Sequence, residues 1–293
     1  MVFRYLMHGV ELSLPFRCED LGESTTDGEA DLDVIAGEVP RLLDAAVLHR
    51  PECDVAPATM LFRGGRRSAR FLIENGRRIT FQKNMRCDER LFAHHLLFPV
   101  LTGALWQRGR CVLHASAVLS PQGAVVVTGA SGAGKSTTVA RLLAEGWPLQ
   151  ADDVCAVDCD GTGRLVVHPG GRSILLDEQS ATRLGFATRG LERRDWQRSK
   201  MNVPAELVAA RQSAPIARIV VLRQAEELSV QTVRGRDKIG LLLQAISGPV
   251  LPDVIAKLEA LLGQVLREIE MIAIGRPTGR WTLDDVAGAI CHG

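Results

Sequence analysis

The segment GASGAGKST, residues 129–137, fits the pattern GxxxxGK[ST] and restricts the possible folds more than any other part of the chain. A β-branched run, Val125 to Val127, precedes it, and the helix-forming segment TVARLLAEG follows it. A glycine-rich turn between a strand and a helix lets backbone N–H groups approach phosphate oxygens, at a helix N-terminus that favours anions. The sequence therefore predicts a phosphate loop, in which Lys135 contacts the β- and γ-phosphates and Ser136 binds Mg²⁺. The predicted nucleotide-binding residues are Gly129, Ala130, Ser131, Gly132, Ala133, Gly134, Lys135, Ser136 and Thr137.

The apolar pattern around this motif predicts an α/β fold. From Cys111 onward, apolar runs alternate with glycines and helical segments, which is typical of strands and helices that share one core. Residues 1–108 are strand-rich, with a hairpin turn expected at Asn75-Gly76 and a helix, kinked at Pro99, over residues 88–109. We therefore expect a smaller β-rich domain over residues 1–108 and an α/β domain over residues 109–293. The charged stretch of residues 187–203 is predicted to be a mobile loop.

Composition argues against several classes of protein. The 35 basic and 34 acidic side chains give a formal charge of +1, so binding of nucleic acid through bulk charge is not expected. No apolar run is long enough to span a bilayer, so no membrane partner is expected either. The seven cysteines are odd in number and none are spaced as CxxC, which indicates reduced thiols in a cytoplasmic protein. The sequence is compatible with a homo-oligomer.

Two adjacent carboxylates, Asp152 and Asp153, follow the loop helix in the segment PLQADDVCAV. An aspartate pair is often only a solvated turn, but a strand after the loop helix would return this pair to the phosphates. Neighbouring side chains at a strand end point to opposite sides. One carboxylate is then expected to hold a metal ion while the other faces a second substrate.

A single histidine, His114, lies in the apolar segment VLHASAV. Such a histidine is more often a satisfied core residue than part of a site. Here, however, only a short turn separates its segment from the run that leads into the phosphate loop, so the two strands are expected to be neighbours. This placement would bring His114 beside the phosphates.

The segments LHAS, TGASGAGKST and QADDVCAV, in this order, resemble the catalytic domain of HPr kinase/phosphorylase and its relatives, the serine kinases found with lasso-peptide and other peptide-modifying gene clusters. The resemblance covers residues 111 to about 185 well and the rest loosely. It implies an HPr-kinase-type phosphate-loop core that transfers the γ-phosphoryl group of ATP, with Mg²⁺, to a serine hydroxyl. By position, it implies that Asp152 lies on the metal side, that Asp153 accepts the serine proton and that His114 acts on both. A protonated His114 would lower the pKa of these carboxylates, whereas a neutral one would orient them by hydrogen bonding.

The chain departs from the bifunctional enzyme in the segment after the aspartates. The family signature that ends in Glu-x-Arg-Gly is replaced by PGGRSILLDEQSATRLG, which argues against the reverse, phosphorylase reaction and favours the kinase-only relatives. We therefore expect the acceptor to be a serine of a precursor peptide, such as a lasso-peptide precursor, rather than HPr. A kinase of HPr, a small-molecule kinase and a nucleotide-sensing module without catalysis are the alternatives.

Phosphoryl transfer needs positive charge near the transferred group beyond that of the loop lysine. Arg172, on a glycine turn, and Lys200, in the charged stretch, are the predicted additional cations. A solvated face, or a grip on an acidic peptide, is the interpretation for three other arginines of that stretch: Arg193, Arg194 and Arg198.

Overall fold

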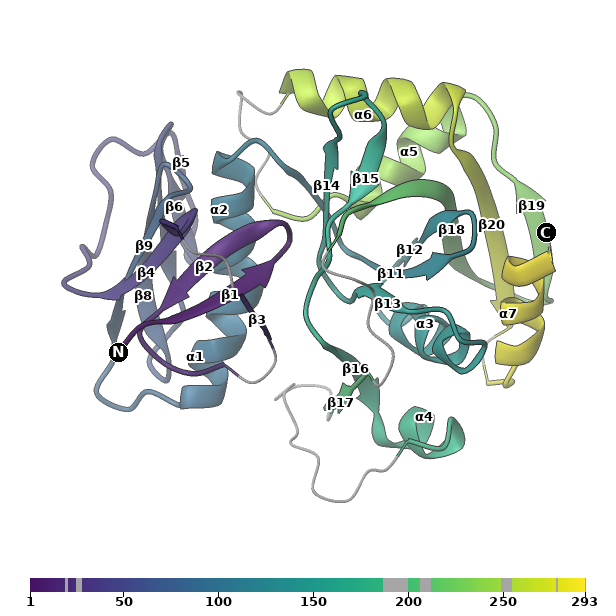
Figure 1. The fold of residues 1–293 in the computed structure, drawn as a ribbon, viewed down its shortest axis with the longest axis horizontal. Coiled ribbons are helices and arrows are strands. Elements are labelled where there is room, and N and C mark those ends of the chain that lie inside the picture. Colours follow the sequence, from purple (N-terminus) through teal and green to yellow (C-terminus); the bar gives the residue numbers. More distant parts are fainter. Residues whose placement is uncertain are drawn as a thin grey trace. The chain divides into compact units, whose positions relative to one another are not determined.

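The computed structural model describes residues 1–18, 21–24, 28–186, 200–205, 212–248, 255–277 and 279–292. Within these residues the chain divides into two compact units (Figure 1). The first comprises residues 1–112 together with Gly248 and Ile255, and the second comprises Leu113–Ser247 and the residues from Ala256 onward. No helix in the described part of the chain is long and apolar enough to cross a membrane.

The first unit is built, within the described residues, on a sheet of nine strands. These are β1 (Phe3–Met7), β2 (Val10–Leu14), β3 (Gly22–Glu23), β4 (Leu32–Ala36), β5 (Leu48–His49), β6 (Cys53–Val55), β7 (Thr59–Arg63), β8 (Ala69–Glu74) and β9 (Arg78–Lys83). Their order in the sheet is β3-β1-β2-β4-β9-β8-β7-β6-β5. β4 runs parallel to both of its neighbours, while β8 is antiparallel to β7 and β9. Buried and partly exposed side chains alternate along β8, as expected of a sheet that packs on one face.

The turn at Asn75 and Gly76 joins β8 to β9 as an antiparallel hairpin, in which Glu74 pairs with Arg78. Asn75 and Gly76 have φ angles of 53° and 60°. Asparagine and glycine are the residues that adopt this left-handed region most readily. The predicted hairpin is confirmed.

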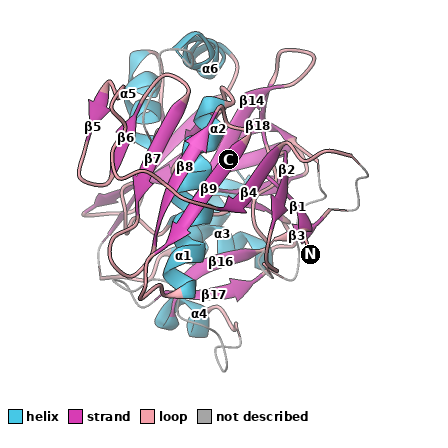
Figure 2. Cartoon of the chain, turned by 90° about the vertical axis from the view of Figure 1, so that its left-hand side faces the viewer, coloured by secondary structure: helices cyan, strands magenta, loops and turns pink. Residues whose placement is uncertain are grey.

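One helical segment packs along a face of this sheet (Figure 2). It consists of α1 (Glu89–His95), the π-helical turn η1 (Leu96–Val100) and α2 (Leu101–Gln107). Asp88 caps its start by accepting hydrogen bonds from two backbone N–H groups of the first turn. Pro99 lies in the π-helical turn, where the widened helix accommodates a residue that has no N–H group. The predicted helix and its irregularity at Pro99 are confirmed.

Aromatic side chains fill the core between this helical segment and the sheet. Phe92 of α1 is 2% exposed, and its ring lies 5.5 Å from that of Phe71 and 5.0 Å from that of Phe81, measured between ring centroids. Trp106 of α2 is fully buried. Burial of large rings of this kind supplies most of the hydrophobic stabilisation that a small domain needs.

The second unit is built on a mixed sheet around the strand that precedes the predicted phosphate loop. The strands are β10 (Cys111–Leu113), in which the chain enters this unit, β11 (Ala115–Ser120), β12 (Gly123–Gly129), β13 (Leu149–Ala151), β14 (Cys155–Cys159), β15 (Leu165–Val167), β18 (Ala214–Ala225), β19 (Ser229–Thr232) and β20 (Glu270–Pro277). Their order is β10-β14-β15-β18-β12-β11-β13, and β20 pairs with β18 and β19. β12, β18 and β20 run parallel, so their carboxyl ends lie at one edge of the sheet.

Helices α3 (Lys135–Ala144) and α7 (Leu283–His292) pack on one face of this sheet. Val139 and Leu142 of α3 share a buried cluster with Val286 of α7 and Ile274 of β20. Where the structure describes this unit, its other helices are α4 (Glu178–Arg183), α5 (Arg236–Ala245) and α6 (Ile255–Arg267). The α/β character predicted from Cys111 onward is confirmed.

The prediction that residues 187–203 form a loop is wrong for residues 200–203, which lie in a strand. Residues 187–199, with the three arginines Arg193, Arg194 and Arg198, lie outside the described residues. Strand β17 (Lys200–Pro204) pairs with β16 (Ser173–Asp177) as a separate two-stranded ribbon. Met201 and Val203 are 3% and 2% exposed, so buried and less buried residues alternate along β17 as in an ordinary strand. In the sequence, the charged residues before β17 obscure this alternation.

Candidate active site

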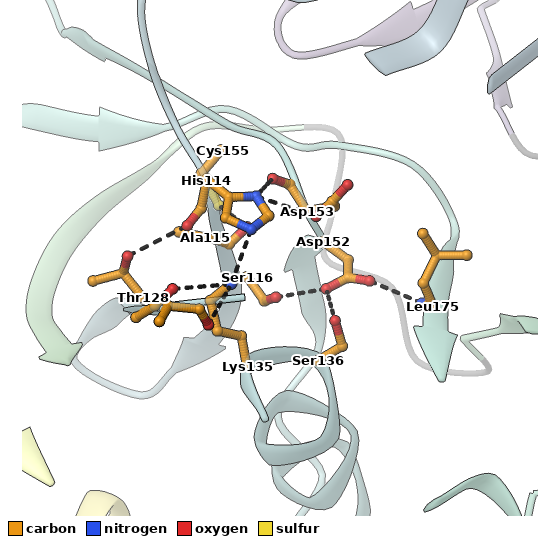
Figure 3. Close-up of polar contacts among 12 residues, drawn as sticks. His114, Ala115, Ser116, Thr128, Lys135, Ser136, Asp152, Asp153, Cys155 and Leu175 are labelled. Carbon is orange, nitrogen blue, oxygen red and sulfur yellow. Dashed lines mark hydrogen bonds and ion pairs between the residues drawn. The ribbon is translucent and has the colours of Figure 1, made fainter. Parts of the chain in front are cut away.

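Three segments meet at the carboxyl end of β12 (Figure 3). β11 lies antiparallel to β12 with Ala115 opposite Thr128, which brings His114 to the point where the predicted phosphate loop begins. β13 pairs with the other side of β11, so Asp152 and Asp153, which follow β13, arrive at the same edge. The predicted proximity of the two strands is confirmed.

The predicted phosphate loop connects β12 to α3, and Gly134 stands immediately before the helix. Gly129 and Gly134 have φ angles of 143° and 94°, in the region that residues with a side chain rarely adopt. A Cβ atom at Gly129 would overlap with the backbone of Leu222 on β18. Strand, loop and helix thus follow one another as the motif predicts. The loop holds Ala130, Ser131, Gly132 and Ala133, and the first turn of α3 holds Lys135, Ser136 and Thr137.

The side chain of Lys135 folds back over the loop. Its ammonium group donates hydrogen bonds to the carbonyl oxygens of Gly129 (3.1 Å) and Ala130 (3.4 Å) and to Nε2 of His114 (3.0 Å). These acceptors are neutral, so an anionic phosphate oxygen would be a stronger acceptor for the same ammonium group.

His114 bridges Lys135 and Asp153. Because an ammonium group has no acceptor, Nε2 of His114 must accept the hydrogen bond, and the ring proton lies on Nδ1. Nδ1 lies 3.2 Å from Oδ1 and 3.3 Å from the backbone oxygen of Asp153. Burial lowers the pKa of His114; the negative charge of Asp153 opposes this effect, and the positive charge of Lys135 adds to it. The ring is therefore neutral near pH 7 and orients Asp153 by donating a hydrogen bond.

The carboxylate of Asp152 accepts three hydrogen bonds and keeps further acceptor capacity on Oδ2. Its Oδ1 atom accepts from the hydroxyl groups of Ser116 (2.5 Å) and Ser136 (2.9 Å), and its Oδ2 atom accepts from the backbone N–H of Leu175 (2.9 Å). Burial raises the pKa of Asp152, and these three donors oppose the rise because they stabilise the ionised form. The carboxylate is thus fixed against the first turn of α3.

Asp153 faces a different way because of its backbone. Its φ angle is 65°, the left-handed region that few residues other than glycine, asparagine and aspartate adopt. This turn separates its carboxylate from that of Asp152 and places it beside His114, with 30% of the side chain exposed. The two aspartates were expected to diverge through strand alternation, but the left-handed turn after β13 is what separates them.

The structure brings one of the two additional cations toward the site. Lys200 begins β17, opposite Asp177 of β16, and its positive charge contributes to the lowered pKa of His114. Arg172 precedes the same ribbon, where its carbonyl oxygen accepts a hydrogen bond from Ala205. The side chain of Arg172 is exposed, and within the described residues it is not brought into contact with the site.

Three groups at the site escaped prediction. Ser116 holds Asp152, and its position two residues after His114 in the LHAS segment is a signal that strand alternation could have supplied. No such signal in the sequence indicated the other two groups. They are the backbone N–H of Leu175 and the side chain of Arg276, which donates to the carbonyl oxygen of Ala133 over 3.1 Å. Both come from elements whose position next to the loop depends on long-range pairing.

No known family model matches the chain, and no curated protein matches its sequence. Among solved structures, the chain is similar to the HPr(Ser) kinase/phosphatase from Coxiella burnetii, with 12% sequence identity and a TM-score of 0.34. The match covers 61% of this chain and 88% of the other. A likeness this distant assigns no activity, so the function must be judged from the site itself.

Proposed function

We propose that this chain is a phosphotransferase that uses a nucleoside triphosphate, and specifically an ATP- and Mg²⁺-dependent kinase that phosphorylates serine in a peptide. The placement of Asp153 carries the proposal. Its partly exposed carboxylate lies beside His114, and the same imidazole contacts Lys135 of the loop. A carboxylate held by a hydrogen bond next to a phosphate-binding loop is suited to act as general base in phosphoryl transfer.

The residues around the loop fit a nucleotide with a divalent cation. The first turn of α3 carries no acidic side chain, so its N-terminus favours an anion. The hydroxyl of Ser136 and the carboxylate of Asp152 lie 2.9 Å apart, and oxygen ligands of this kind suit Mg²⁺, which takes its other ligands from phosphate and water. Bound there, Mg²⁺ would neutralise charge on the phosphates.

In the proposed reaction the serine oxygen attacks the γ-phosphorus, and the bond from that phosphorus to the β–γ bridging oxygen breaks. ADP leaves with the electron pair of the broken bond. The proton of the serine hydroxyl passes to the carboxylate of Asp153, which His114 keeps oriented from Nδ1. Lys135 and the loop N–H groups stabilise the charge that develops on the phosphate oxygens.

The finer part of the proposal concerns the acceptor, a serine near the end of a short, flexible precursor peptide such as a lasso-peptide precursor. The side chain of Asp153 is only 30% exposed, and an extended chain end reaches such a recessed group with less steric conflict than a folded partner such as HPr. The segment after the aspartates forms β16 and α4 and lacks the Glu-x-Arg-Gly signature of the bifunctional enzyme. Both observations favour a kinase of peptides.

The test is transfer to candidate peptides encoded beside this protein, followed by intact mass spectrometry. The wild-type protein with ATP and Mg²⁺ should add about 80 Da, the mass of one phosphoryl group, to a peptide serine. Asp153→Asn keeps the left-handed backbone and removes the base, so it should abolish transfer while the protein still binds ATP. The control is Asp285→Asn, which changes an exposed aspartate of α7.

Other outcomes would select the alternatives. Phosphorylation of HPr with no change in any peptide would reverse the choice of acceptor. Transfer to a small hydroxyl compound alone would indicate a small-molecule kinase. Tight ATP binding without transfer to any acceptor would indicate a nucleotide-sensing module.

A further inference from the structure

Arg276, near the end of β20, contacts the phosphate loop. One of its terminal N–H groups donates to the carbonyl oxygen of Ala133 over 3.1 Å. A Cβ atom at Gly134 would overlap with the Arg276 guanidinium, so the glycine that precedes α3 also leaves room for this side chain. The guanidinium therefore lies directly against the backbone from which the N–H groups of the loop arise.

Strand register explains how a residue of β20 reaches this place. Gly129 of β12 pairs with Leu222 of β18, which pairs in turn with Ile274 of β20. Arg276 is two residues beyond Ile274 and shares its face of the strand, which is the face that packs against α3. The side chain thus projects past the edge of the sheet toward the start of that helix.

No carboxylate in the described part of the chain balances the charge of Arg276. Within the described residues, its guanidinium makes its hydrogen bond to the neutral carbonyl of Ala133, and no carboxylate lies at ion-pair distance. The side chain of Arg276 is partly buried, and this desolvation lowers the pKa of its guanidinium. Lys135 lies at the same helix N-terminus, where a cation is unfavourable because the helix dipole is positive there. Two cations at such a place become favourable once an anion binds between them.

We propose that Arg276 is a nucleotide-binding residue, whose charge neutralises the diphosphate that ATP and ADP share while one of its N–H groups holds the loop at Ala133. This inference rests on the proposed function. A guanidinium carries five N–H donors, and the described residues engage one of them, at the loop; the others can donate to phosphate oxygens. In this way β20 adds a second cation to the one that the loop motif supplies.

Equilibrium binding of ADP and of adenosine to the full-length protein tests the inference with two variants. Arg276→Lys keeps the charge, whereas Arg276→Gln keeps an N–H donor for the loop and loses the charge. ADP affinity should fall about tenfold or more in Arg276→Gln, as expected when a charge-assisted hydrogen bond is lost, and stay within about threefold in Arg276→Lys. Adenosine, which has no phosphate, should bind all three proteins equally. Arg280→Gln, at an exposed arginine of the next turn, is the control, and thermal unfolding checks that each variant folds.

Each other outcome contradicts the inference in a recognisable way. Wild-type ADP affinity in Arg276→Gln would show that the charge plays no part in binding. An equal loss of ADP affinity in Arg276→Lys and Arg276→Gln would show that Arg276 only holds the loop in its conformation. If the wild-type protein binds neither ADP nor ATP, the proposed function fails and this inference fails with it, whereas the first two results leave the proposed function intact.

Discussion

The ammonium group of Lys135 donates to Nε2 of His114 over 3.0 Å, while Nδ1 of the same ring faces Asp153. The loop lysine and the proposed base are therefore joined through one imidazole. A phosphate that draws Lys135 away would leave His114 with Asp153 as its partner. In the proposed function, this contact would couple nucleotide binding to the state of the base.

The first prediction is that Lys135→Met raises the pKa of His114. The positive charge of Lys135 disfavours the protonated ring, so its removal moves the pKa up toward the ordinary value of about 6.5. NMR titration of the imidazole C–H signals measures the change. An unchanged His114 titration would contradict the coupling. The same variant should bind nucleotide weakly and show no transfer.

His114 should matter for transfer far more than for nucleotide binding. In His114→Asn the side-chain amide takes the place of Nδ1 and keeps a donor for Asp153, whereas His114→Gln places its amide nearer to Lys135. We expect kcat to fall about a hundredfold in His114→Gln, through misplacement of the base, and clearly less in His114→Asn. Nucleotide affinity should change little in either. Steady-state kinetics with separate binding measurements distinguishes this from a packing role, which would lower both quantities together.

Ser116→Ala should weaken the proposed metal site without unfolding the protein. The hydroxyl group donates to Asp152 over 2.5 Å and opposes the rise in the pKa of that carboxyl, so its loss makes the ionised form less favourable. The Mg²⁺ concentration required for half-maximal activity should rise about tenfold to a hundredfold, as is usual for a residue that supports a metal ligand. Ser120→Ala, at the other end of β11, is the matched control. An equal effect of both variants would refute this role.

Asp54 should be a major source of stability in the first unit. Its carboxylate is fully buried and accepts two hydrogen bonds from Arg63, at 2.7 and 2.8 Å, which hold its pKa well below the ordinary value. Asp54→Ala removes the carboxylate from Arg63 and leaves its guanidinium with backbone carbonyl acceptors alone, so chemical denaturation should show a loss of about 3 kcal/mol. Glu89→Ala, which removes the exposed ion pair with Lys83, should cost about 1 kcal/mol or less.

The first unit should also lose stability in mild acid because of His95. Burial lowers the pKa of His95 to about 4, and the adjacent His94 adds to the effect. Between about pH 6.5, the unfolded value, and pH 4 the unfolded chain binds the proton more tightly, so the free energy of unfolding falls as pH falls through this window. Denaturation at pH 7 and pH 5 should show this loss in the wild type and a smaller one in His95→Gln. His292→Gln should behave like the wild type.

The features that could be predicted from the sequence are those set by neighbouring residues. Asn75-Gly76 fixes the β8–β9 hairpin, and Pro99 marks the irregular turn of the long helix. The positive φ angles of the loop between β12 and α3 require the glycines that the sequence places there. The short connection between β11 and β12 makes their pairing a local event as well. The position of His114 beside the loop therefore follows from residues that are close together in the chain.

The remaining features depend on contacts between distant segments. β12 is flanked by β18 and then β20, and nothing in the segment around Arg276 indicates that its strand ends beside the loop. The ribbon of β16 and β17 stands apart from the main sheet although β16 reads as an ordinary apolar strand. The identity of a strand follows from local pattern, whereas its neighbours are decided by the packing of the whole unit.

The left-handed backbone of Asp153 has a consequence for how this protein could change over evolutionary time. Glycine, asparagine and aspartate are the residues that adopt such a backbone conformation readily. Of these, only aspartate has a side chain that can act as a base and take the proton of a substrate hydroxyl group. Codons for asparagine and for glycine each differ from those for aspartate by a single nucleotide. If Asp153 is the proposed base, a catalytically silent descendant that keeps its fold is one point mutation away, and an asparagine or glycine here in a related sequence would mark a protein without transfer activity.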